Sequence, residues 1–300
     1  MRNLLFFPIL SFLFMGQIKA QEEEWTTMLR AGSRFDLEET YTHLKNRLVE
    51  NSEIKIFAEI DHSKNAREVG LELEPARVII FGNAKAGTPL MQDRQLVGLD
   101  LPLKILVGED EKGKVLLVYS AVDYLKMRHA LNSDKVLNNI KKSLKKIVDD
   151  VTGRNPKRMD KYKIRYNEGI ESIKSKLNFK ETLSRLKKEI TAMNEVSLFA
   201  EIDHTKNAEE LGMRLRPTTL LVFGNPKVGT ILIQEARHSA LELPVKMLVW
   251  QDENGAVRIS YNSSQFLARR FGIDEDLKAL DVLNKAKRGL AQKAAGYTFE

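Results

Sequence analysis

The chain has 300 residues, of which 43% are hydrophobic and 30% charged, a composition typical of globular domains with apolar cores. It contains no cysteine, which excludes disulfides, thiolate metal sites and haem attached through a Cys-x-x-Cys-His motif. The formal net charge of +7 comes mainly from residues 132–163, so a basic nucleic-acid-binding surface on the domains is not indicated.

Residues 1–20 have the pattern of a secretory signal peptide. Arg2 supplies the positive charge, residues 4–15 form an apolar run, and Ala20 is a small residue before a cleavage point at Gln21. The run is short for a membrane span, although an uncleaved anchor is the alternative interpretation. We expect export to the periplasm or beyond, with no transmembrane segment after signal removal. The lack of cysteine suits an oxidising compartment.

The first structural elements follow the signal in chain order. A strand with poor alternation is expected near residues 25–32. Apolar residues at helical spacing over residues 37–48 predict an amphipathic helix. Apolar and polar residues alternate over residues 54–60, which predicts a half-buried strand.

A short helix and a central strand come next. Asp61 or Ser63 caps the helix, which ends at Gly70. Residues 78–81 are apolar on both faces and predict a central strand, and residues 82–91 turn the chain into another helix.

The series closes with a hairpin and a helix. Two apolar runs, residues 105–107 and 115–118, flank a turn at residues 110–113 that contains a glycine. The last helix begins near Ala121. The predicted order is β-α-β-α-β-α-β-β-α, an α+β sandwich with helices packed on a largely antiparallel sheet.

This series of elements occurs twice. The motif FAEIDH at residues 57–62 returns at residues 199–204, and the register then holds without a gap to Tyr119 and Tyr261, with half of the positions identical. We therefore predict two tandem copies that pair as a pseudo-dimer. The predicted divisions are a signal peptide, a first copy, a basic helical connector, a second copy and a C-terminal helical tail, at residues 1–20, 21–131, 132–163, 164–272 and 273–300.

Several spaced motifs resemble one known family. These are FAEIDH, then GLELEP at residues 70–75, then FGNAKAGT at residues 81–88, then LPLK at residues 101–104. In this order they resemble the domain-of-unknown-function 302 family over residues 24–131 and 165–272. The resemblance implies a TATA-binding-protein-like α+β fold and self-association, extending to a homo-oligomer, but no agreed activity.

The two copies depart from the family pattern at different positions. Ala84 stands where the family usually has proline, which Pro226 keeps. Gly108 stands where the second copy and the family have tryptophan, here Trp250. We therefore do not assume that the copies are functionally equal.

An Asp-His pair follows the same strand in both copies, as Asp61-His62 and Asp203-His204. An aspartate beside a histidine can orient an imidazole for proton transfer, which makes these four residues the candidate catalytic groups. The alternative is structural, with the aspartate capping the next helix and the histidine bonding locally. No Ser or Cys lies in a nucleophile-elbow context.

A glycine-rich turn that leads into a helix is the candidate ligand-binding loop. Its backbone N–H groups, with a lysine and a threonine, are suited to an anion, although the Gly-Lys-Ser/Thr ending of a P-loop is absent. The alternative is a tight turn in which the glycines adopt special dihedrals. The candidate residues are Gly82, Asn83, Lys85, Gly87 and Thr88, with Gly224, Asn225, Lys227, Gly229 and Thr230 in the second copy.

The sequence indicates no cofactor and no metal site, because one histidine per copy supplies too few ligands unless the copies meet. Residues 136–148 form a helical apolar face with flanking lysines. We expect that face to pack on the domain, the alternative being an anionic membrane surface. Residues 153–163 are expected to be flexible.

The leading hypothesis is an exported, non-catalytic module that binds a small or anionic ligand. The ligand is expected near Asp61, His62 and the loop of residues 82–88, with the mirror set in the second copy. One alternative is an enzyme that uses His62 or His204 as general acid-base with Lys85 or Lys227 in support. Another is a structural assembly protein without a pocket.

Overall fold

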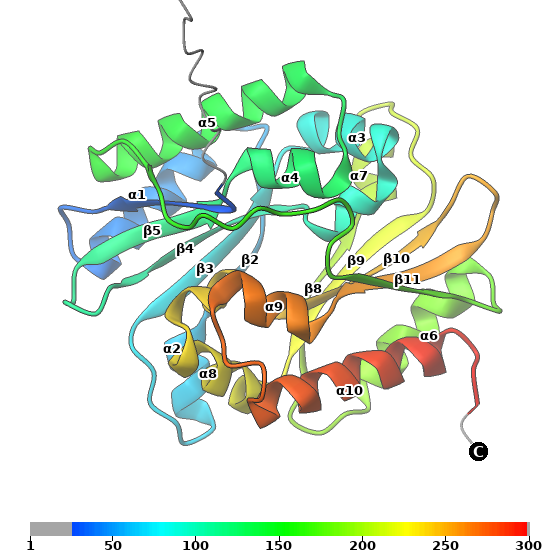
Figure 1. Ribbon diagram of the computed structural model, residues 1–300. Coiled ribbons are helices and arrows are strands. Elements are labelled where there is room, and N and C mark those ends of the chain that lie inside the picture. Colours follow the sequence, from blue (N-terminus) through cyan, green and yellow to red (C-terminus); the bar gives the residue numbers. More distant parts are fainter. Residues whose placement is uncertain (1–25, 299–300) are drawn as a thin grey trace, which may run out of the picture.

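The computed structural model describes residues 26–298, so the expected signal peptide lies outside the described residues (Figure 1). The first copy has the predicted order of elements. They are β1 (Met28–Gly32), α1 (Leu37–Val49), β2 (Lys55–Asp61), α2 (His62–Glu68), β3 (Ala76–Gly82), α3 (Ala84–Asp93), the 3-10 helix η1 (Gln95–Leu99), β4 (Leu103–Glu109), β5 (Val115–Ser120), α4 (Val122–His129) and α5 (Asp134–Thr152).

The second copy repeats the series. Its elements are β7 (Ile170–Lys174), α6 (Phe179–Thr191), β8 (Ser197–Asp203), α7 (His204–Glu209), β9 (Thr218–Gly224), α8 (Pro226–Glu235), the 3-10 helix η2 (Arg237–Leu241), β10 (Val245–Gln251), β11 (Val257–Asn262), α9 (Ser264–Phe271) and α10 (Lys278–Ala294).

Each copy builds one antiparallel sheet. The strand order is β2-β3-β4-β5-β1-β6 in the first sheet and β7-β11-β10-β9-β8 in the second, so equivalent strands occupy equivalent places. The central strands β3 and β9 are buried on both faces, as their apolar runs predict. The expected α+β class, with two tandem copies, is confirmed.

Two long helices cover the outer face of each sheet. Helices α1 and α5 lie over the first sheet, and α6 and α10 lie over the second (Figure 1). The apolar side of α5 enters the first core through Leu144 and Val148, whereas Lys142 and Lys146 are exposed. The apolar face of the basic segment is therefore buried against its own domain.

The inner faces of the two sheets share a single apolar core. Ile80 and Leu106 of the first sheet and Val222 and Leu248 of the second belong to the same buried cluster. Packing is reciprocal, because η1 lies against β10 while η2 lies against β3 and β4. In the same way α2 packs on α8, and α3 packs on α7. The copies thus form the expected pseudo-dimer.

The segment between the copies is held in place rather than free. Gly153, with a φ of 67°, ends α5, and the short strand β6 (Lys157–Arg158) then pairs with β1. The Asp160 carboxylate accepts hydrogen bonds from the backbone N–H groups of Thr27 and Met28 at 2.9 and 2.8 Å. The expectation of a flexible segment is wrong, because these bonds fix it to the edge of the first sheet.

The fold also extends the two copies beyond the divisions expected from the sequence. Residues 132–152 supply a helix to the first core, and α10 supplies the equivalent helix to the second. No helix among residues 26–298 is long and apolar enough to cross a membrane.

Candidate functional site

Two cavities lie at equivalent places, each beside one of the glycine-rich loops. We call the cavity at residues 82–88 the first pocket and the cavity at residues 224–230 the second pocket. Their volumes are about 370 and about 130 Å³. Nine of the ten candidate ligand-binding residues line one of these two pockets. The exception is Lys227, which does not line the second pocket.

Each pocket combines residues of both copies. His204 and Asn207 of the second copy line the first pocket, and His62 and Asn65 of the first copy line the second. The sequence hypothesis placed each histidine beside the loop of its own copy, and this pairing is wrong. Helix α2 starts at the sheet edge and packs on α8 of the other copy, which carries His62 across the interface.

The aspartates of the two Asp-His pairs are helix caps. Asp61 Oδ1 accepts hydrogen bonds from the Lys64 N–H and the Ser63 hydroxyl, both at 2.8 Å, and Asp203 Oδ1 accepts from the Lys206 N–H at 2.9 Å. Partial burial would raise the pKa of Asp61, but these hydrogen bonds outweigh it and lower the pKa. Their carboxylates therefore serve the first turns of α2 and α7.

The histidines are buried in the interface between the copies. His62 Nε2 lies 3.1 Å from the Ala240 carbonyl oxygen of η2, and because a carbonyl only accepts, Nε2 carries the hydrogen. His204 faces the carbonyl groups of Gly98 and Leu101, but its Nε2 atom has no hydrogen-bond partner among the described residues. Burial lowers the pKa of both histidines to about 4, so both are neutral at pH 7.

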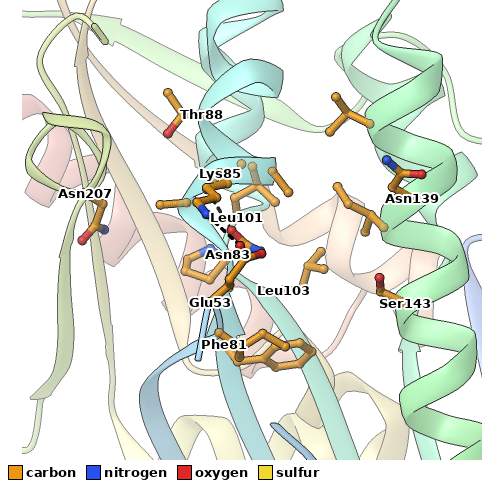
Figure 2. Close-up of a pocket in the computed structure, with 18 of the residues that line it drawn as sticks. Glu53, Phe81, Asn83, Lys85, Thr88, Leu101, Leu103, Asn139, Ser143 and Asn207 are labelled. Carbon is orange, nitrogen blue, oxygen red and sulfur yellow. Dashed lines mark hydrogen bonds and ion pairs between the residues drawn. The ribbon is translucent and has the colours of Figure 1, made fainter. Parts of the chain in front are cut away.

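The first loop is organised by Asn83 and an exposed ion pair (Figure 2). Asn83 Oδ1 accepts from the Lys85 N–H at 2.9 Å and caps α3, while its amide donates to Glu53 at 3.0 Å. Lys85 Nζ lies 2.7 Å from Glu53 Oε1, and this bond is the main cause of the lowered pKa of Glu53. Lys85 is thus paired with an exposed carboxylate, and the N-terminus of α3 already has a cap.

Gly82 has a steric role rather than a conformational one. Neither Gly82 nor Gly87 has a positive φ, contrary to the expectation of special dihedrals. A Cβ atom at Gly82 would lie 3.2 Å from the Cβ atom of Pro102, and one at Gly224 would meet Pro244 at the same distance. The loop therefore needs glycine because a neighbouring proline packs against its backbone.

Two residues that line the first pocket each have a buried polar atom without a hydrogen-bond partner among the described residues. The Thr88 hydroxyl is buried and makes no hydrogen bond, and His204 Nε2 is the second such atom. The equivalent threonine of the second copy differs, because Thr230 Oγ1 donates to the Pro226 carbonyl oxygen at 2.8 Å. An unpaired buried hydroxyl costs about 1–3 kcal/mol, so the two equivalent threonines contribute differently to stability.

The rest of the first pocket is mainly apolar. Phe81, Leu101 and Leu103 form one wall, and α5 forms the opposite one, with Asn139 and Ser143 facing the cavity (Figure 2). The second pocket is closed in the same way by α10, which contributes the buried Lys287. Burial lowers the pKa of Lys287 to about 8, and its ammonium group donates to the Asn262 carbonyl oxygen.

Neither helical wall was predicted, because we placed these two helices outside the copies, in the connector and the C-terminal tail. The signal that identifies them was available. The repeat register that pairs the loops also pairs residues 136–148 with residues of α10. Within residues 26–298, no cluster of three or more His, Asp or Glu side chains is placed to hold a metal ion.

Comparison with known proteins gives a family, curated relatives and a solved structure. The family described as "Domain of unknown function DUF302" matches residues 30–151 and 171–292 and so includes α5 and α10. The chain is also similar to two proteins named fluoride-specific ion channel FluC 1. The one from Brucella suis biovar 1 (strain 1330) is 34% identical over 132 residues, which are 43% of this chain and 51% of the relative.

The other, from Brucella abortus biovar 1 (strain 9-941), is 34% identical over 132 residues, covering 43% of this chain and 48% of the relative. The chain thus spans about half the length of the curated relatives it matches. A crystal structure of an uncharacterized conserved protein DUF302 from Bacillus stearothermophilus matches with a TM-score of 0.39 and 19% identity, over 42% of this chain and 98% of that chain.

The two equivalent threonines form a matched pair for mutation. Thr88→Val removes a buried hydroxyl that has no partner, so we expect the free energy of unfolding to rise by about 1 kcal/mol. Thr230→Val removes a hydrogen bond to Pro226 and should lower the free energy of unfolding by about 0.5–1.5 kcal/mol. Urea unfolding of both variants gives the two values, and equal losses of stability would contradict the assignment of Thr88.

The buried histidines predict acid sensitivity. In the unfolded chain each histidine binds a proton below its ordinary pKa of 6.5, whereas in the folded protein it stays neutral down to about 4. Stability is therefore complete above pH 6.5 and falls as the pH approaches 4. Between pH 7.5 and pH 5 we expect a loss of roughly 2 kcal/mol for each histidine.

The measurement compares urea midpoints at pH 7.5 and pH 5 for the wild type and the variant His62→Gln with His204→Gln. Glutamine keeps a donor for the Ala240 carbonyl but does not titrate. The variant should lose much less stability than the wild type on acidification. An equal loss would show that other groups carry the acid sensitivity.

Proposed function

Because the chain belongs to the DUF302 family, whose description names no activity, we propose from its geometry that it is an exported, non-catalytic module that binds a small amphiphilic molecule in the first pocket. The ligand has an apolar body and one polar end. The two copies act together, since each contributes side chains to the pocket.

The observation that carries the proposal is a mainly apolar cavity to which both copies contribute polar residues. Thr88 and His204 come from different copies and line the same pocket, and each has a buried polar atom without a hydrogen-bond partner among the described residues. A hydroxyl both donates and accepts, and a neutral imidazole nitrogen does either according to its tautomer. We propose that an alcohol or amide end group lies at the Thr88 and His204 end of the pocket, while the apolar body lies along α5.

An anionic ligand is less well supported than a neutral one. Lys85, the cation expected to bind an anion, is paired with Glu53, and the first turn of α3 is capped by Asn83. The wall residues from β3 and β4 are apolar, the polar residues that α5 adds, Asn139 and Ser143, are uncharged, and burying a charge against this wall is costly. We therefore propose a neutral polar end group rather than a phosphate or sulfate.

The second pocket is not proposed as an equivalent site. It has about a third of the volume, its threonine hydroxyl is satisfied by Pro226, and His62 is bonded to Ala240. The channel activity in the names of the Brucella relatives belongs to those proteins, and we do not extend it to this chain.

Binding of an apolar fluorophore tests the proposal. We expect N-phenyl-1-naphthylamine to bind the protein with a saturable rise in fluorescence and a stoichiometry near one. Ser143→Phe places a ring at the exposed side of the first pocket and should abolish the signal.

Two control variants locate the binding. Val282→Phe makes the corresponding change at the second pocket, and Lys142→Phe places a ring on α5 outside the lining of either pocket. Both should bind the fluorophore like the wild type. Unchanged binding by Ser143→Phe, or no saturable binding at all, would refute the proposed site.

The proposal also includes export, which rests on the signal-like pattern of residues 1–20. We expect the mature protein from a native envelope or culture fraction to begin at Gln21, as determined by N-terminal sequencing. A full-length protein recovered from the cytoplasm would remove export from the proposal and leave the binding site unaffected.

A further inference from the structure

A second feature lies between the two copies, next to the first pocket. Three pairs of equivalent charged residues meet there, and we call them the interface charge cluster: Asp100 and Glu242, Lys104 and Lys246, Arg128 and Arg270. Each pair contributes one residue from each copy. The cluster therefore forms only when the copies are together.

The two carboxylates are fully engaged by the cations around them. Asp100 lies 2.7 Å from Arg128 Nη1 and 3.3 Å from Lys246 Nζ. Glu242 lies 2.7 Å from Lys246 Nζ and 3.1 Å from Arg270 Nη1. Lys246 thus bridges the acids of both copies, and each acid has an arginine of its own copy.

Lys104 is the exception in the cluster. Its ammonium group donates to the main-chain oxygen of Glu242 at 3.1 Å, and within the described part of the chain it forms no ion pair with a carboxylate. Four basic side chains therefore share two acidic ones. An ammonium has three donors, so Lys104 retains hydrogen-bonding capacity and unbalanced charge.

A cavity of about 20 Å³ lies beside Lys104. Ser120 and Tyr124 line it together with Lys246 and the two carboxylates, Asp100 and Glu242, which are themselves paired with cations. Its volume fits one occupant the size of a water molecule. The Ser120 hydroxyl accepts from Arg270 Nη2 at 2.8 Å, so its own hydrogen remains to be donated.

We infer that this cavity binds one small monovalent inorganic anion, no larger than a water molecule, between the Lys104 ammonium group and the Ser120 hydroxyl. The anion offsets the excess positive charge of the cluster, in which Lys104 is partly exposed and the other five residues are buried. It joins the two copies, because Lys104 belongs to the first and the surrounding Lys246 and Glu242 belong to the second.

The residues that the repeat makes equivalent to Ser120 and Tyr124 do not form a second anion site. The residue equivalent to Ser120 is Asn262, whose amide donates to Glu242 at 2.8 Å and whose oxygen accepts from Arg128 at 2.7 Å. The residue equivalent to Tyr124 is Phe266, which has no polar atom. One anion per chain is expected.

Protonation of Lys104 sets the pH range of binding. Desolvation, followed by repulsion from Lys246, lowers the pKa of Lys104 to about 7. Around it, the pKa of Glu242 is lowered to about 2 and that of Asp100 far below its usual range, despite burial, by the adjoining cations. Both acids therefore stay ionised between pH 6 and pH 7.5, and binding should be tighter at pH 6.

The remaining groups near Lys104 do not change charge in that interval. Burial lowers the pKa of His62 to about 4 and also lowers that of His129, and it raises the pKa of Tyr119 and Tyr124. Arg128 and Arg270 remain charged. Lys287, with a pKa of about 8, donates to the Asn262 carbonyl oxygen and does not line the cavity. Mutation of Lys104 distinguishes the titration of Lys104 from that of Lys287.

Melting of the purified full chain in fluoride tests the inference, with gluconate keeping the ionic strength constant. Fluoride is about the size of water and should raise the melting temperature in a saturable way, more at pH 6 than at pH 7.5. Chloride is larger and should have little effect at the same concentration. Fluorine NMR of the same samples should show one bound fluoride per chain.

Three variants assign the binding. Lys104→Met should abolish the fluoride response, and Ser120→Ala should weaken the apparent affinity about tenfold or more, because a hydrogen bond to a charged group is lost. Lys85→Met, which removes an exposed lysine, should respond like the wild type. If Lys104→Met does not fold, the Ser120→Ala titration and the NMR stoichiometry decide the question.

Equal melting curves in fluoride, chloride and gluconate would show that the cavity holds only water and would overturn the inference. A fluoride response retained by Lys104→Met or unchanged in Ser120→Ala would overturn it as well. Neither result tests the first pocket, which shares Pro102, Leu103 and Leu144 with this cavity but is tested with a neutral probe and its own variants.

Discussion

Burial of the inner faces of the two sheets against each other determines most of what is distinctive in this protein. Each copy covers the outer face of its own sheet with two long helices, but the inner face is completed by η1 or η2 of the other copy. The shared cluster contains apolar residues from both sheets. A lone copy would expose that surface to water, so the copies depend on each other.

This packing of elements from one copy on the other explains why the candidate site contains residues of both copies. Helix α2 crosses to α8 and helix α7 crosses to α3, so each loop is completed by a histidine from the opposite copy. The position of each histidine is fixed by the interface core rather than by its neighbours in sequence. Local chemistry around Asp61 and His62 is therefore that of a helix cap and an interface contact.

Local patterns in the sequence were sufficient for the fold. The repeat, the apolar run of β3 and the alternation of β2 predicted the element order, because these patterns depend only on which residues face a sheet. The turn chemistry of residues 82–88 predicted a ligand-binding loop, and this loop lines the first pocket.

The contacts between side chains of different copies could not be predicted from local patterns. The distance between His204 and Thr88 depends on how two folded copies pack, and no spacing within one copy encodes it. The interface charge cluster is similar, since Asp100 and Lys246 are far apart in the chain and each is unremarkable in its own segment. Long-range packing decided both.

The fusion of two equivalent copies into one chain has a consequence for how the molecule can change. In a homodimer of identical subunits, every substitution at the interface occurs twice and must be tolerated at both places. Here Ser120 and Asn262, or Thr88 and Thr230, are independent positions within one chain. One half of the interface is free to acquire a new contact while the other preserves the original packing.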